Sequence, residues 1–79
     1  MNIEKKFKEI VAQYCDFTPE EIKKSLRFRE DLGFSSLDFM SMLGEVEDEF
    51  DLELNEEKAT SIHTIGEAIT LLDEMALAG

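Results

Sequence analysis

The chain has no tryptophan and few residues of several other kinds: one cysteine, one proline, four glycines, and eight lysines plus arginines in 79 residues. Because the lone Cys15 cannot form an intrachain disulfide, small disulfide-stapled secreted domains are excluded. No apolar run approaches the roughly 20 residues of a membrane span. The N-terminal stretch becomes polar too soon for a secretory signal. We therefore expect a monomeric, cytoplasmic single domain over residues 1–79.

The charge is strongly of one sign, with 19 Asp plus Glu against 8 Lys plus Arg and a net charge of −11. Phosphate contacts need clustered cations, so this balance argues against a nucleic-acid partner. An acidic surface instead attracts basic protein surfaces over long range. The acidic run at residues 45–54 lacks the glycine that a calcium loop needs at its sixth position. We expect no metal site.

Hydrophobic periodicity predicts an all-α fold. Apolar residues at helical spacing indicate helices over residues 2–15 and 36–50, a short third helix over 54–59, and a last helix from residue 65. Residues 16–35 are expected to form a long ordered connection with one or two helical turns. No stretch alternates with the period of a strand. The predicted architecture is a small four-helix bundle with a long loop between its first two helices.

Local start signals support these segments. Thr18 followed by Pro19 is typical of a helix N-cap and first helical position. Asn55 is a favoured cap for the short third helix. Thr64 with Glu67 three residues later matches the capping box and predicts the start of the last helix.

The helix over residues 36–50 has two faces on a wheel of about 100° per residue. The expected core face holds Phe39, Met42, Leu43, Val46 and Phe50. The opposite face holds Leu37, Met40, Ser41 and Gly44, rimmed by the acids Asp38, Glu45, Glu47 and Asp48. Single exposed apolar residues are normal in proteins, so a partner-binding surface and simple exposure are both open. A mid-helix glycine costs about 1 kcal/mol relative to alanine. Close approach by a partner, room for a ligand, or tolerated drift would each explain it.

Ser36 opens this helix. Serine is a favoured N-cap, and capping alone accounts for its presence in most proteins. A helix N-terminus is also a good seat for a covalently attached phosphate, since unpaired N–H groups and the positive end of the dipole favour an anion.

The stretch "EDLGFSSLDFMSMLGEVEDEFDLEL", residues 30–54, resembles the acyl carrier proteins. Their signature is Asp-Leu-Gly-x-Asp-Ser-Leu-Asp followed by an acidic helix. The length, the acidic charge, "TPEEI" and "TIGEAI" resemble the same family, so the likeness covers nearly the whole chain.

The resemblance implies a four-helix bundle with 4'-phosphopantetheine attached through a phosphodiester to Ser36, because Leu37 and Asp38 then take their expected places. Ser35 stands where the family usually has aspartate, and Ser41 where an acid is common. Both departures leave open whether the chain is the housekeeping carrier of fatty acid synthesis or a specialised one.

The chemistry implied is covalent carriage of acyl groups as thioesters, for fatty acid or polyketide-type synthesis, and not catalysis by the chain itself. A phosphopantetheinyl transferase and acyl-processing synthases with basic docking surfaces are the implied partners. By resemblance the acyl chain lies beside the second and third helices, where Val46, Leu54, Ala59 and Ile62 are candidate cleft residues. Ordinary core packing would explain the same four residues.

Two alternatives remain open. An unmodified acidic adaptor with a carrier-like fold would dock on a basic partner without any prosthetic group, and a carrier of aminoacyl groups would keep the arm with another cargo. His63, the only histidine, has no nucleophile placed beside it by any motif and is expected in a solvated loop. Cys15 is expected to pack as a small apolar residue.

Overall fold

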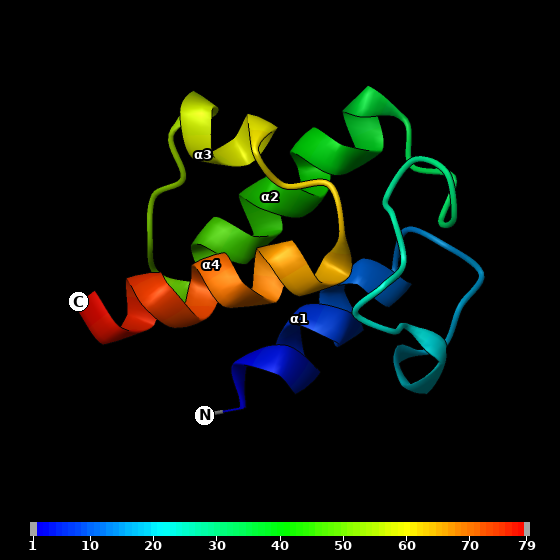
Figure 1. Cartoon of the computed structure of the whole chain (residues 1–79), viewed down its shortest axis with the longest axis horizontal. Helices are drawn as coiled ribbons and strands as arrows, with labels where there is room; N and C mark the ends of the chain where they lie inside the picture. The colour runs from blue at the N-terminus through cyan, green and yellow to red at the C-terminus, as the bar shows by residue number, and fades with distance from the viewer. Residues whose placement is uncertain (1, 79) are drawn as a thin grey trace.

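The computed structural model describes residues 2–78, with side chains to residue 76. Its elements are α1 (Ile3–Ala12), the 3-10 turn η1 (Pro19–Glu21), α2 (Ser36–Phe50), α3 (Glu56–Thr60) and α4 (Ile65–Ala78) (Figure 1). Among the described residues the only β-type pairing is an isolated bridge between Arg27 and Thr64. The predicted all-α bundle with a short third helix is confirmed.

The helix boundaries follow their local signals. α2 has the predicted bounds, and Asn55 caps α3 by accepting the Lys58 N–H at 2.8 Å. α1 is shorter than the predicted 2–15, because Gln13 and Tyr14 donate to carbonyls three residues back, which tightens and ends the helix. α3 starts at residue 56 rather than 54, since the backbone of its cap, Asn55, is extended.

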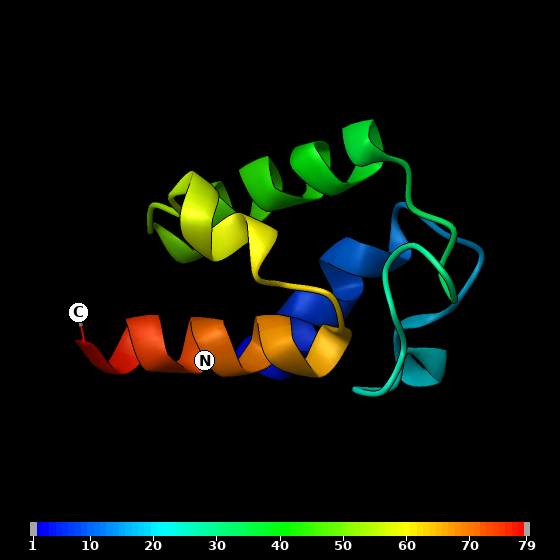
Figure 2. The same ribbon diagram turned by 45° about the horizontal axis from the view of Figure 1, so that its top comes forward.

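One hydrophobic core joins the helices. α1 packs against η1, α2 and α4, and Figure 2 shows α2 and α4 on opposite sides with α1 crossing between them in that view. The fully buried large side chains are Phe7, Val11, Ile22, Met42, Val46 and Ile65. No helix within the described part of the chain is long and apolar enough to cross a membrane.

The connection between α1 and α2 is ordered and occupies one end of the molecule (Figure 1). Its side chains Ile22, Phe28, Leu32 and Phe34 are buried. Its backbone pairs with the segment that opens α4: the Phe28 N–H donates to the His63 carbonyl at 3.2 Å, and the Ile65 N–H to that of Leu26 at 3.0 Å. Gly33 has a φ of 72°, a left-handed conformation that glycine adopts without strain. The ordered loop thus fixes the position of Ser35 and Ser36 at the start of α2.

Candidate functional site

Ser35, not Ser36, caps α2. The Asp38 N–H donates to Ser35 Oγ at 3.1 Å, and the Ser35 N–H donates to Asp38 Oδ2 at 3.1 Å, so the two residues form a reciprocal capping box. The interpretation of Ser36 as an ordinary N-cap is therefore wrong. Ser36 is the first helical residue, and its hydroxyl is not used to cap the helix.

The Ser36 hydroxyl is exposed and has a cationic neighbour. Arg29, in the loop before α2, donates from Nη2 to Ser36 Oγ at 3.1 Å. The N–H groups of Ser36 and Leu37 have no partner within the helix, because they belong to its first turn. The positive end of the helix dipole adds to the guanidinium charge. The N-terminus of α2 at Ser36 is therefore suited to bind an anion, although the protein as a whole is acidic.

A cavity of about 970 Å³ adjoins Ser36. Its wall comes from the loop before α2, from one side of α2, and from α3 with the residues that flank it. The apolar part of the wall consists of Phe28, Phe39, Met40, Leu43, Leu54, Ala59 and Ile62. An exposed hydroxyl beside a largely apolar cavity suits a ligand that is fixed at one end and apolar at the other.

Three of the four predicted cleft residues, Leu54, Ala59 and Ile62, line this cavity. Val46 does not: it is 1% exposed and faces the core one turn after Met42. Sequence reasoning missed Phe28 and Arg29, because their place beside α2 depends on a loop conformation with no periodic signal.

The predicted partner face divides into two groups. Leu37 and Met40 are 76% and 64% exposed, and Asp48 is exposed. These three side chains are available at the surface, although Met40 also borders the cavity. An exposed apolar pair beside acids is suited to a partner that is both apolar and basic.

The other members of that face have contacts within the chain. Asp38 belongs to the capping box, Glu45 accepts a hydrogen bond from Tyr14, and Glu47 accepts the Leu54 N–H at 2.8 Å. Gly44 and Glu47 line the cavity. The sequence pattern placed all of them on one face of α2 but gave no sign of these contacts.

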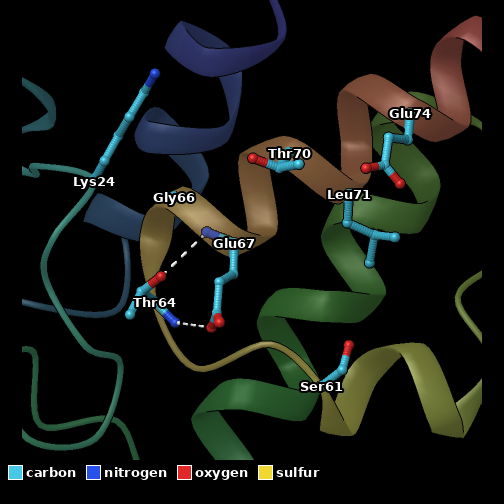
Figure 3. A pocket seen from close by; sticks show the side chains of 8 residues that line it. All are labelled: Lys24, Ser61, Thr64, Gly66, Glu67, Thr70, Leu71 and Glu74. Carbon is cyan, nitrogen blue, oxygen red and sulfur yellow. Dashed lines mark hydrogen bonds between the residues drawn. The ribbon is translucent and has the colours of Figure 1, made fainter.

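A second hollow, of about 510 Å³, lies at the start of α4 (Figure 3). Glu67 accepts the N–H groups of His63 and Thr64 at 2.7 and 3.0 Å, and the Glu67 N–H donates to Thr64 Oγ1. These hydrogen bonds, that from His63 foremost, hold the pKa of Glu67 below its ordinary value. The predicted capping box is confirmed. We interpret this hollow as part of the structural junction at the start of α4.

Within the described residues, no group of three or more His, Cys, Asp and Glu side chains is arranged to hold a metal ion. His63 is exposed, and its backbone is tied to Glu67 and Phe28. Cys15 is half-buried, and its Sγ contacts the Val11 carbonyl at 3.6 Å. Ser36, Thr60 and His63 all line the larger cavity, and the Ser36 hydroxyl is the one that accepts a hydrogen bond from a guanidinium.

Known proteins match this chain along most of its length. The family described as "Phosphopantetheine attachment site" matches residues 5–72. A protein of Sulfurovum sp. (strain NBC37-1) named acyl carrier protein is 35% identical over 68 residues, covering 86% of this chain and 91% of its own. One of the same name from Buchnera aphidicola subsp. Acyrthosiphon pisum is 34% identical over 76 residues, covering 96% and 95%.

Structures agree with the sequence matches. The solved structure of the acyl carrier protein from Enterococcus faecalis superposes with a TM-score of 0.77 at 28% identity, covering 89% of each chain. Because the family match spans residues 5–72 and the relatives align over nearly their full length, the chain belongs to the acyl carrier protein family, whose members have a phosphopantetheine attachment site.

Proposed function

We propose that Ser36 is the attachment residue, and that this chain carries fatty or polyketide-type acyl groups between the enzymes of a biosynthetic pathway. As in its family, the chain is a carrier and not an enzyme, and a separate transferase adds 4'-phosphopantetheine covalently. When bound, this group supplies a flexible arm with a terminal thiol that holds the acyl group as a thioester. The protein anchors the arm, encloses the acyl group and presents it to other enzymes.

The single observation that carries the proposal is the position of Ser36. Its hydroxyl is exposed and not engaged in capping, it contacts the Arg29 guanidinium, and it adjoins a largely apolar cavity. The first-turn N–H groups and the guanidinium fit the negative charge of a phosphodiester. The cavity fits an apolar chain, with Leu54, Ala59 and Ile62 in its wall.

The proposal extends to partners. A net charge of −11 favours enzymes with basic docking surfaces. Leu37 and Met40 are proposed as apolar contacts for such a partner, and Asp48 as an acidic one. The same proposal includes that the protein is monomeric, that it functions in the cytoplasm, and that residues 1–79 form one domain. The shared core of the described residues and the unpaired Cys15 support it.

Incubation with coenzyme A and a phosphopantetheinyl transferase tests the attachment residue. Intact mass should rise by one phosphopantetheine group in the wild type and in Ser35→Ala, and should not change in Ser36→Ala. Ser35→Ala is the matched control, because it removes a neighbouring hydroxyl that caps the helix. Modification that persists in Ser36→Ala and disappears in Ser35→Ala would refute the assignment. No modification of any form would favour the adaptor alternative.

A further inference from the structure

Arg29 is distinguished from the other cations of the chain by its contact. Four ion pairs lie within the described residues: Lys6–Glu49, Lys8–Glu4, Lys24–Glu4 and Arg27–Glu30. Arg29, like Lys5, Lys23 and Lys58, is in none of them, although the chain has 19 acidic residues. The side-chain hydrogen bond that the structure gives it goes to Ser36 Oγ. In so acidic a protein, this leaves a guanidinium charge for a group attached at that oxygen.

The fold fixes the backbone on either side of Arg29. Phe28 is 2% exposed and donates its N–H to the His63 carbonyl, and the Phe34 N–H donates back to the Phe28 carbonyl at 2.8 Å. The Leu32 N–H donates to the Arg27 carbonyl at 3.0 Å. These bonds close the loop into a compact turn that is anchored in the core. Arg29 therefore extends from an ordered backbone next to Ser36.

The two residues nearest to Ser36 that could compete for Arg29 are Ser35 and Asp38. Residue 35 is a neutral serine, and the Asp38 carboxylate is already engaged by the Ser35 N–H at 3.1 Å. Guanidinium forms two parallel hydrogen bonds with phosphate oxygens, which an ammonium group cannot do. The Asp38 carboxylate could compete with a phosphodiester for the Arg29 guanidinium, but it already accepts the Ser35 N–H.

We propose that Arg29 is a positioning residue for the prosthetic group: its guanidinium contacts the phosphodiester on Ser36 and holds the root of the arm beside the cavity. The inference rests on the proposed function, because it requires attachment at Ser36. It goes further by assigning a second residue, outside the signature, to the phosphodiester.

The test compares apo and holo forms of the wild type, Arg29→Gln, Arg29→Lys and Arg27→Gln at low salt. The quantity measured is the change in melting temperature on attachment, with intact mass confirming each form. In Arg29→Gln this change should be lower than in the wild type by about 1–8 °C, the range expected for an exposed charge pair in a small domain. Arg29→Lys should restore part of it. Arg27→Gln removes the same charge from an arginine already paired with Glu30, and should leave the change as in the wild type.

A second readout follows the contact itself. In the wild type the side-chain NH resonance of Arg29 should shift on attachment. The ³¹P resonance of the phosphodiester exists only in the holo forms and is compared among them. The phosphorus shift should differ in Arg29→Gln but not in Arg27→Gln. The difference should fade near 1 M salt, where the screening length is about 3 Å.

The outcomes separate the two proposals. If Ser36 takes up the group but Arg29→Gln matches the wild type in both readouts, the role of Arg29 is overturned and the attachment proposal stands. If Arg27→Gln has the same effect as Arg29→Gln, the effect is one of net charge and the positioning role is again overturned. If Ser36 is not modified in the wild type, both proposals fail.

Discussion

The Tyr14 hydroxyl, just after α1, donates a hydrogen bond to Glu45 Oε1 on α2, 31 residues away in the sequence. This contact joins two helices at the surface and engages an acid that the sequence pattern assigned to partner docking. The hydrogen bond, with burial and the negative charge of Glu45 adding to it, raises the pKa of Tyr14 to about 12.

Tyrosinate absorbance should report this contact directly, because Tyr14 is the only tyrosine and the chain has no tryptophan. The titration midpoint in the folded protein should be about 12, and it should move toward the ordinary value of about 10 in Glu45→Ala. The raised pKa belongs to the folded state. Its stabilising effect should therefore be complete below about pH 10 and be lost as the pH rises through about 12.

Asp48→Ala is the control for that titration, since it removes one exposed acid from the same helix. Circular dichroism at each pH confirms that the helices persist over the range fitted. A midpoint that stays near 12 in Glu45→Ala, or that moves equally in both variants, would contradict the assignment of the hydrogen bond as the cause.

Replacing Ser35 and replacing Ser36 by alanine should have different effects on the free energy of unfolding, because only Ser35 caps α2. Ser35→Ala should reduce the free energy of unfolding by about 1 kcal/mol, because it removes the acceptor for the Asp38 N–H. Ser36→Ala in the apo form should change it by less than about 0.5 kcal/mol, as for a surface site outside the cap. Urea unfolding of the apo variants measures both, and an equal loss in the two would show that the cap is not specific to Ser35.

Much of the fold was predictable because its signals are local. α2 has both a start signal and an uninterrupted helical period, and its predicted and observed bounds agree. α1 was predicted too long because the period alone does not show that the chain tightens at Gln13 and Tyr14. The N-cap was assigned to Ser36 rather than to Ser35. Either serine can cap a helix, and only the backbone geometry shows that Ser35 does so here.

The candidate site was less predictable because much of its wall is not helical. Leu54, Ala59 and Ile62 were predicted as cleft residues from the family resemblance, and they line the cavity. Phe28 and Arg29 reach the cavity through a loop whose position depends on a backbone bond to His63, 35 residues further on. No sequence period encodes such a pairing. The resemblance indicated Ser36 as the attachment residue that we propose, and the structure added its neighbours.

Thermal stability should rise with salt. A net charge of −11 on 79 residues produces self-repulsion in the compact state, and the screening length falls to about 10 Å at 0.1 M salt. The exposed ion pairs that salt also weakens contribute little each. Melts of the apo protein between low and moderate sodium chloride measure the trend. Asp48→Asn, which removes one exposed acid, should melt higher at low salt and gain less from added salt. A flat or falling curve would contradict the prediction.

The same substitution at two helical glycines should have opposite effects. A Cβ at Gly44 would have nothing within 4 Å, so Gly44→Ala should stabilise the protein by about 1 kcal/mol through helix propensity alone. A Cβ at Gly66 would lie 3.2 Å from the Lys24 carbonyl oxygen, which accepts the Gly66 N–H at 2.9 Å. The crowding would push the loop off α4, so Gly66→Ala should destabilise by on the order of 1 kcal/mol despite its better propensity.

Urea unfolding of both variants, each compared with the wild type in the apo form, checks this pair. Each is the control for the other, since the two share a propensity gain and differ only in what the new methyl group meets. Stabilisation by both would mean that the Lys24 carbonyl moves away at little cost, and that the loop is joined to α4 less rigidly than its hydrogen bonds imply. Destabilisation by both would mean that the space at Gly44, in the wall of the cavity beside Ser36, is not free in solution.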